Sequence, residues 1–316
     1  MISTSLEEFE ISIDNVATAA ARKAGDAILA GSGSISLSND IYSKIGSRDI
    51  VTEVDKACQA VIKDTIIAAF PHHSFLGEED IDPGIEASVN AIERYKDVPH
   101  LWIVDPIDGT TNFAHGMPLS GVIIAYASYG ITQYGAIFDP FRNELFTAWL
   151  GKGAYLNGTP IRCCGTSNLS GSVIATGSPP NLKALAACLR ATQQISHKVR
   201  TVRMLGSAAV MLSWVAMGRL TAYCEADLNV WDLAAGALMI REAGQHLFIH
   251  EISIADLIYM KAGPLILYLS CNTGGNVTDV WGQDYSLTTR NLVASNGLIH
   301  RDLLDELVQA EMWIEE

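Results

Sequence analysis

Hydrophobic residues recur at helical spacing in the first seventy positions of the chain, which predicts two helices there. The apolar repeat of the first helix is Val16, Ala20, Ala24 and Ile28. Gly31 together with Gly33 is expected to end this helix. The second helix should follow Thr52 and end before Pro71. Its apolar face is predicted to contain Val54, Cys58, Val61, Ile62, Ile66 and Ala69.

Short apolar runs separated by turn residues predict strands in the next part of the chain. The predicted strands are residues 74–76, 101–104, 122–127, 134–138 and 144–149. The last three are expected to be antiparallel, because Gly130 and the segment 139–143 supply turn residues between them.

The second half of the chain repeats this mixture of helices and strands. Strands are predicted at 173–176 and 220–224, and helices at 181–197, 207–217 and 230–243. Strands with helices on both sides imply an α+β core built in layers, with mixed rather than purely parallel sheets. We expect a single domain over residues 1–316, with a weak sub-domain boundary near 165–171.

The composition narrows the class of protein. Of the 316 residues, 49% are hydrophobic and 18% are charged, which excludes global disorder. Lys and Arg number 21 against 35 Asp and Glu, a formal charge of −14, so nucleic acid is excluded as an expected partner. The most apolar segment, 247–269, is interrupted by charges and a proline, so no membrane span is expected. The acidic start of the chain lacks the pattern of a targeting signal, so we expect a cytoplasmic protein, or an organellar one if the start is incomplete.

Acidic residues follow the predicted strands and open one predicted helix. Glu78 and Glu79 come after a strand and a glycine, Asp105 and Asp108 lie just past the next strand, and Asp232 lies in the first turn of a helix. Strand ends meet at one rim of a sheet, so these acids can share a pocket. Clustered carboxylates raise one another's pKa unless a cation neutralises them. Oxygen ligands without His or Cys favour Mg²⁺, and two such ions would clamp a phosphate and activate water.

The segment Asp-Pro-Ile-Asp-Gly-Thr at 105–110 is more specific than any single acid. Its proline fixes the backbone after Asp105, Gly109 permits close approach to a ligand, and Thr110 offers a hydroxyl to orient water. Taken with Glu78 and Asp232, it is more than an ordinary turn.

These motifs resemble the signatures of the inositol monophosphatase family. The segments that carry the resemblance are residues 77–79, 102–113 and 231–236, with further matches at 49–55, at 151–158 and from 274 to the end. The resemblance implies a layered αβαβα sandwich with mixed, largely antiparallel sheets. It also implies a phosphatase that depends on Mg²⁺, is sensitive to lithium and forms a homodimer.

Carried over residue by residue, the resemblance implies two to three Mg²⁺ ions. Glu78, Asp105 and the carbonyl of Ile107 would hold the first ion. Asp105, Asp108 and Asp232 would hold the second, and Glu79 would act through water on a third.

The same resemblance assigns residues to the water and to the substrate. Thr110, hydrogen-bonded to Asp55, would position the attacking water with Glu78, so these three are the expected catalytic residues. The implied substrate contacts are Gly109, Thr110, Ala208, Glu225 and Asp232, and Lys44 is a possible further site residue.

We therefore expect hydrolysis of myo-inositol monophosphates by metal-activated water, without a covalent intermediate. One alternative is a phosphatase for another small ester, such as histidinol phosphate, fructose 1,6-bisphosphate or a galactose phosphate. An alternative of another class is an inactive binding or scaffold homologue. The expected partner of the enzyme is a small phosphorylated polyol or sugar substrate.

One segment departs from the family pattern. Residues 245–273 interrupt a connection between a helix and a strand that would otherwise be very short. The segment is either a genuine insertion or translated non-coding sequence. Because Asp232 lies at the opposite end of the preceding helix, we expect residues 245–273 to project away from the acids and to contribute no catalytic group.

Overall fold

The computed structural model describes residues 6–32, 41–43, 50–243 and 274–313. Lys44 and the segment 245–273 therefore lie outside the described residues. The helices are α1 (Leu6–Gly31), α2 (Glu53–Ala69), α3 (Ile85–Tyr95), α4 (Thr110–Ala114), α5 (Leu182–Ser196), α6 (Ala208–Ala216), α7 (Val230–Glu242) and α9 (His300–Gln309), with 3₁₀ turns η2 (Glu78–Asp80) and η3 (Leu169–Gly171).

The described strands form three sheets. They are β1 (Ile41–Ser43), β2 (Ile50–Thr52), β3 (Ser74–Gly77), β4 (Leu101–Asp108), β5 (Gly121–Ser128), β6 (Ile131–Asp139), β7 (Glu144–Trp149), β8 (Gly153–Leu156), β9 (Thr159–Pro160), β10 (Val173–Thr176), β11 (Thr201–Arg203), β12 (Ala222–Glu225), β13 (Asn276–Asp279) and β14 (Leu292–Ser295). The large sheets have the orders β3-β4-β5-β6-β7-β8-β9 and β11-β10-β12-β14-β13, and β1 pairs with β2.

Both large sheets are mixed, as expected. In the seven-stranded sheet β3 and β4 are parallel and every other pairing is antiparallel. In the five-stranded sheet β10 is parallel to β11 and β12, and β14 is antiparallel to β12 and β13. The antiparallel run β5-β6-β7 predicted from the turn residues is confirmed.

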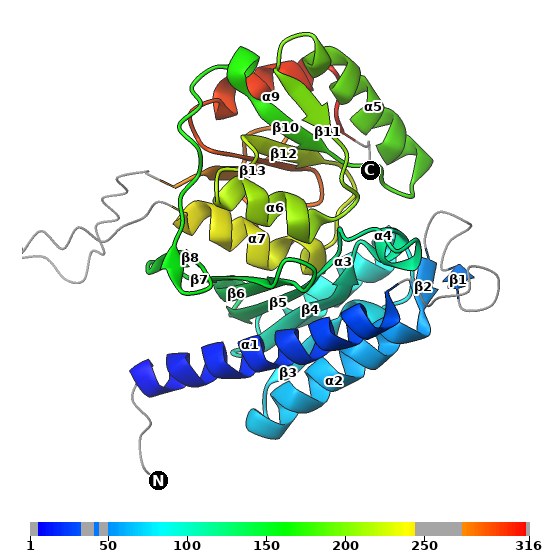
Figure 1. The fold of residues 1–316 in the computed structure, drawn as a ribbon, viewed down its shortest axis with the longest axis vertical. Helices are drawn as coiled ribbons and strands as arrows, with labels where there is room; N and C mark the ends of the chain where they lie inside the picture. Colours follow the sequence, from blue (N-terminus) through cyan, green and yellow to red (C-terminus); the bar gives the residue numbers. More distant parts are fainter. Residues whose placement is uncertain (1–5, 33–40, 44–49, 244–273, 314–316) are drawn as a thin grey trace, which may run out of the picture.

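Helices and sheets alternate in five layers (Figure 1). Helices α1 and α2 cover one face of the seven-stranded sheet, α6 and α7 lie between the two sheets, and α5 and α9 cover the outer face of the five-stranded sheet. Each helical layer encloses its own apolar core, with Ile62, Leu212 and Leu303 as central members of the three. The predicted αβαβα sandwich is confirmed. Among the described residues, no helix is long and apolar enough to cross a membrane.

Helix α7 is buried on all sides, because sheets or helices contact it around its whole circumference. Its small residues permit this close packing. A Cβ on Gly236 would lie 2.5 Å from Cδ1 of Leu212 on α6, and a Cβ on Gly135 of β6 would lie 2.8 Å from Cα of Ala235. The helix that carries Asp232 is therefore fixed tightly between the sheets.

The predicted face of α2 was partly wrong. Val61 is 38% exposed and Ala69 is exposed, whereas Cys58, Ile62 and Ile66 are buried as expected. The buried face also contains two polar residues, Asp55 and Gln59. The hydrophobic pattern found most of this face but missed Asp55 and Gln59, because an apolar repeat does not register buried polar residues.

Strand β4 is longer than predicted. It continues through Asp105 and Asp108, so these acids lie within the strand and not beyond it. The pairing with β5 shifts register between the two aspartates. Pro106 lacks a backbone N–H, and such a residue fits a strand at an irregularity. Helix α3 was not predicted from the sequence.

The chain passes from the first large sheet to the second through residues 161–172, which include the predicted boundary at 165–171. Helices α6 and α7 pack against strands of both sheets, so we retain one domain as a proposal. The described residues that flank the segment 244–273 meet, because the N–H of Gly275 donates to the carbonyl of Ile240 at 2.9 Å.

Candidate active site

The carboxyl end of β4 presents two aspartates to one cavity. The backbone N–H of Ile107 donates to Oδ1 of Asp105 at 3.0 Å, which fixes that carboxylate beside its own strand. Asp105 is 2% exposed and Asp108 is 7% exposed. The irregular pairing between them allows both side chains to reach the same space despite a spacing of three residues.

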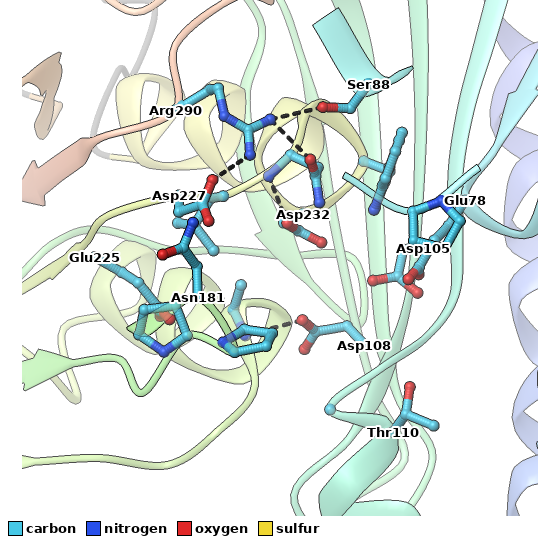
Figure 2. Close-up of a pocket in the computed structure, with 18 of the residues that line it drawn as sticks. Glu78, Ser88, Asp105, Asp108, Thr110, Asn181, Glu225, Asp227, Asp232 and Arg290 are labelled. Atoms are coloured by element: carbon cyan, nitrogen blue, oxygen red, sulfur yellow. Dashed lines mark hydrogen bonds and ion pairs between the residues drawn. The ribbon is translucent and has the colours of Figure 1, made fainter. Parts of the chain in front are cut away.

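A third carboxylate comes from α7. One oxygen from each of Asp105, Asp108 and Asp232 lies within 4.8 Å of the other two. The N–H of Asn229 donates to Oδ2 of Asp232 at 2.7 Å and holds that side chain at the start of the helix. Glu78, at the end of β3, lines the same cavity and lies beside Asp105 in Figure 2. Four of the five predicted acids are thus together, and Glu79 is not among the residues that line the cavity.

Burial and mutual repulsion dominate the electrostatics of this cluster. Burial raises the pKa of Asp105 well above its usual range, and Glu78, Asp108 and Asp232 raise it further. Burial, with the charge of Glu78, has the same effect on the pKa of Asp232. Burial raises the pKa of Asp108 to about 6, although three hydrogen bonds oppose the increase. Such a cluster requires protons or a cation, and its oxygen donors suit Mg²⁺.

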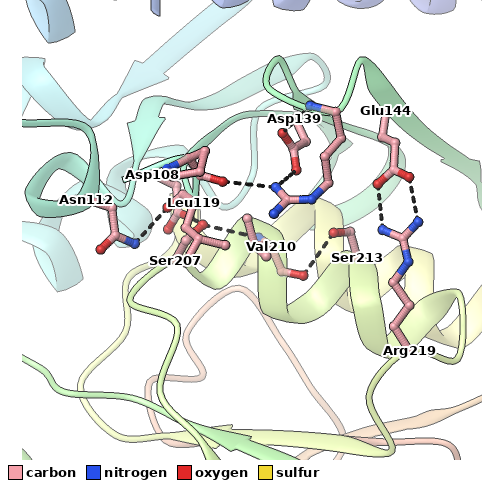
Figure 3. Close-up of polar contacts among 11 residues, drawn as sticks. Asp108, Asn112, Leu119, Asp139, Glu144, Ser207, Val210, Ser213 and Arg219 are labelled. Atoms are coloured by element: carbon pink, nitrogen blue, oxygen red, sulfur yellow. Dashed lines mark hydrogen bonds and ion pairs between the residues drawn. The ribbon is translucent and has the colours of Figure 1, made fainter. Parts of the chain in front are cut away.

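Asp108 also joins the two halves of the site. Asp108 lies beside Ser207 (Figure 3) and accepts a hydrogen bond from its hydroxyl. It also accepts hydrogen bonds from the N–H of Ala208 at 3.0 Å and from the N–H of Ala209 at 2.9 Å. The carboxylate therefore binds the N-terminus of α6, where negative charge is favourable. The N–H of Ala208, predicted to contact substrate, is used by Asp108 in this structure.

The hydroxyl predicted to orient water is in place. Oγ1 of Thr110 lies 3.2 Å from Oδ1 of Asp55 and 3.0 Å from the carbonyl of Ile107. Asp55 is held by the N–H of Thr52 at 2.8 Å and is 1% exposed. Burial raises the pKa of Asp55 to about 6. The predicted hydrogen bond between Thr110 and Asp55 is confirmed.

Position 109 does not accommodate a side chain. Its φ is +82°, and a Cβ there would lie 2.9 Å from the carbonyl oxygen of Leu119. Both Gly109 and Thr110 line the cavity beside Asp108. The backbone at this point can approach a bound anion as the motif predicted.

Glu225 lies at the far side of the cavity from Glu78 (Figure 2). The hydroxyl of Tyr223 donates to its Oε2, and burial raises the pKa of Glu225 to about 7. Gly177 provides the space for this carboxylate, because a Cβ at 177 would lie 1.6 Å from its Cδ.

The cavity has a volume of about 490 Å³, the size of a small-molecule site. The predicted site residues that line it are Glu78, Asp105, Ile107, Asp108, Gly109, Thr110, Ala208, Glu225 and Asp232. Asp55 acts behind Thr110, and Glu79 does not line the cavity. The N–H of Glu79 donates to Oε1 of Gln59 at 2.9 Å, on the buried face of α2.

The sequence did not identify several residues that shape the site. Ser207 is hydrogen-bonded to Asp108, which lies 99 positions earlier in the sequence. Arg290 is hydrogen-bonded to Asn229, which lies 61 positions earlier. Gly177 borders Glu225 from another strand. None of these residues belongs to a local motif, and only the fold brings them to the cavity.

Comparison with known proteins is consistent with this geometry. Residues 11–313 match the model of the Inositol monophosphatase family. Inositol monophosphatase 2 of Solanum lycopersicum is 35% identical over 309 residues, which cover 97% of this chain and 100% of that protein. Nus factor SuhB of Escherichia coli (strain K12) is 39% identical over 231 residues, or 73% of this chain and 82% of SuhB.

The fold also matches solved structures. The structure of the IMPase of Thermotoga maritima has a TM-score of 0.74 and is 29% identical. The match covers 97% of this chain and 98% of that chain. The layers described above are therefore those of a solved IMPase.

Proposed function

This chain belongs to the inositol monophosphatase family, and we propose that it is a Mg²⁺-dependent phosphomonoesterase that hydrolyses myo-inositol monophosphates. The observation that carries the proposal is the set of three carboxylates within 4.8 Å, in one cavity with Glu78 and Thr110. Family membership supports a phosphatase, and the oxygen donors support the choice of metal.

The carboxylates of this chain fit two cations. Glu78, Asp105 and the carbonyl of Ile107 would hold one cation. Asp105, Asp108 and Asp232 would hold the other. Glu79, which does not line the cavity, would act only through water on a third. Bound Mg²⁺ would neutralise the phosphate charge and lower the pKa of water.

Thr110 and Asp55 determine the orientation of the attacking water. The hydroxyl of Thr110 faces two acceptors, Oδ1 of Asp55 at 3.2 Å and the carbonyl of Ile107 at 3.0 Å. If the carbonyl of Ile107 holds a cation, the single proton of Thr110 would be donated to ionised Asp55, which can only accept. The oxygen of Thr110 then accepts a hydrogen bond from the water, which directs a lone pair of the water toward phosphorus. Glu78 would accept the other water proton. Attack by water leaves no covalent intermediate on the chain.

Glu225 supports a polyol substrate. An ionised carboxylate accepts hydrogen bonds from hydroxyl groups, and Glu225 lies across the cavity from the acids that would hold the metal. Gly109 and Thr110 provide backbone for the phosphate. The cavity also admits other small esters, so histidinol phosphate, fructose 1,6-bisphosphate and galactose phosphate remain alternatives.

A non-catalytic binding role is the alternative of another class. The name of the bacterial relative, Nus factor SuhB, gives a role other than hydrolysis for that protein. In this chain the proposed carboxylate ligands and the pair Thr110 and Asp55 are all present, which supports catalysis. We also propose a homodimer, by analogy with the family, to be tested by analytical ultracentrifugation.

The test is phosphate release from a panel of esters with Mg²⁺ and with EDTA. The proposal predicts release from myo-inositol 1-phosphate that requires Mg²⁺ and is inhibited by lithium. Preference for another ester would correct the substrate. No release from any ester, by protein that binds Mg²⁺, would favour the binding role.

A further inference from the structure

Arg290 contacts three consecutive residues, 227–229, just before α7. Its guanidinium donates to Oδ1 of Asn229 at 2.9 Å and forms an ion pair with Asp227, and its carbonyl accepts the N–H of Leu228 at 3.0 Å. The same guanidinium donates to Oγ of Ser88 on α3 at 2.7 Å (Figure 2). One residue therefore ties the segment 227–229 to a separate helix.

The segment 227–229 leads directly into the helix that carries Asp232. The N–H of Asn229 donates to Oδ2 of Asp232 at 2.7 Å, so any movement of Asn229 moves the partner of that carboxylate. Asp227 has a φ of +64°, an unfavourable conformation for a residue with a side chain. The ion pair, in which the side chains of Arg290 and Asp227 are 20% and 9% exposed, offsets that cost.

Among the described residues that line the cavity, Arg290 is the only Lys or Arg. Its charge is directed at Asp227, and its remaining hydrogen bonds go to neutral oxygens of Ser88 and Asn229. The planar guanidinium of Arg290 donates to several oxygens at fixed angles and so fixes the position of the backbone that carries them. The ammonium group of a lysine would not reproduce this arrangement.

We propose that Arg290 is a positioning residue that sets the affinity of the site for Mg²⁺, by fixing residues 227–229 and so the carboxylate of Asp232. The inference rests on the proposed metal-dependent function. Residues that orient metal ligands commonly change metal affinity by tenfold to a hundredfold when they are replaced.

The sign of the effect separates positioning from simple electrostatics. Removing a positive charge beside a cation site would by itself strengthen Mg²⁺ binding, because the repulsion between the two cations is lost. Loss of positioning weakens binding instead. For Arg290→Gln we expect the Mg²⁺ dissociation constant to rise about tenfold.

The experiment is calorimetric titration of the metal-free protein with Mg²⁺, together with turnover as a function of Mg²⁺ concentration. Arg290→Gln should raise the half-saturating Mg²⁺ concentration in both measurements, by a larger factor than it lowers turnover at saturating Mg²⁺. The matched control is Arg219→Gln, which removes an ion pair with Glu144 away from the cavity and should leave Mg²⁺ binding unchanged.

A second variant protects the test against loss of folding. Arg290→Gln combined with Asp227→Asn leaves no unpaired charge and keeps the local net charge of the wild type. This double variant should recover thermal stability but retain weakened Mg²⁺ binding. Arg290→Lys should lie between wild type and Arg290→Gln, since lysine pairs with Asp227 but lacks the fork that also reaches Asn229.

Unchanged or tighter Mg²⁺ binding in folded Arg290→Gln and in the double variant would overturn the inference. A merely structural role would lower the midpoint of thermal unfolding by the same amount with and without Mg²⁺. If the wild-type protein itself binds no Mg²⁺, the proposed function fails and not only the role of Arg290.

Discussion

Glu225 occupies a space that exists because residue 177 is glycine. A Cβ at that position would lie 1.6 Å from Cδ and 1.7 Å from Oε2 of Glu225, a clash that requires the carboxylate to move. The three atoms nearest to that Cβ all belong to Glu225 and none to the acids proposed to hold the metal, so this space concerns the part of the cavity assigned to substrate.

We therefore predict that Gly177→Ala raises KM for the substrate at least tenfold, a loss of about 1.4 kcal/mol of binding energy. The shift of the unfolding midpoint caused by Mg²⁺ should remain. The control is Gly165→Ala, where an added Cβ meets no atom within 4 Å. An unchanged KM in Gly177→Ala would show that Glu225 does not bind the substrate.

The buried carboxyls give the metal-free protein a defined dependence on pH. Burial raises the pKa of Asp55 and Asp108 to about 6 and that of Glu225 to about 7. Unfolded carboxyls titrate near pH 4, so the folded state binds these protons more tightly. As the pH rises from about 4 to about 7, these groups lower the free energy of unfolding.

A bound cation would offset this loss as the carboxylates ionise with rising pH, and protons would compete with the cation for the same carboxylates at lower pH. We predict that saturating Mg²⁺ raises the midpoint of thermal unfolding more at pH 7.5 than at pH 5. The midpoint measured in EDTA is subtracted from the midpoint measured in Mg²⁺ at each pH. This difference removes the effect of groups that titrate in the same way in both samples. Equal increments at the two pH values would contradict a site made of these carboxylates.

At the scale of elements, the end of α7 holds a turn of the first sheet. The carboxylate of Glu242 accepts the N–H of Gly151 and the N–H of Gly153, both at 2.9 Å, and Glu242 is 2% exposed. The turn between β7 and β8 thus depends on a helix that is distant in sequence. This contact gives a structural role to the first two glycines of the segment 151–158.

Glu242→Ala should lower the free energy of unfolding by about 2–4 kcal/mol, because two buried N–H groups lose a charged acceptor. Urea unfolding monitored by circular dichroism measures the change. The control is Glu93→Ala, which removes an exposed pair with Lys96 and should cost less than about 1 kcal/mol. A loss of equal size in both variants would contradict the role of Glu242.

The connection after α7 gives a second prediction at this scale. The described residues on either side meet through Gly275 and Ile240, at the end of α7 opposite Asp232. Deletion of residues 245–273, so that Gly244 joins Gly274, should therefore preserve turnover and Mg²⁺ dependence. Phosphate release by the purified deletion variant is the measurement. A folded but inactive variant would show that the deleted segment contributes to the site.

The sequence predicted those elements whose signals lie within a short stretch of the chain. The run β5-β6-β7 follows from apolar segments separated by turn residues, and the acids of β4 follow from a compact motif. The predicted face of α2 was partly wrong, because Val61 and Ala69 are exposed while Asp55 and Gln59 are buried, and an apolar repeat does not register buried polar residues. The contact of Arg290 with Ser88 spans 202 positions, and no local pattern predicts a contact of that length.

At the scale of the whole molecule, the site takes residues from both large sheets and from the helices between them. Asp105 and Asp108 come from the first sheet, Glu225 from the second, and Asp232 from the layer between. A chain with a formal charge of −14 repels a phosphate ester, so the cluster requires a cation to bind one. Metal binding should consequently join the layers as well as support catalysis.

Phosphate release from myo-inositol 1-phosphate, measured against Mg²⁺ concentration for wild type and Asp105→Asn, tests the proposed function most directly. Asp105 is the carboxylate that would be shared by both ions, so its neutralisation should weaken both positions together. We predict saturable, Mg²⁺-dependent release by the wild type and nearly none by Asp105→Asn. Because repulsion within the cluster falls, the metal-free variant should unfold at or above the wild-type midpoint. Near wild-type turnover by Asp105→Asn at saturating Mg²⁺, or full wild-type activity in EDTA, would contradict a metal-dependent site on these carboxylates.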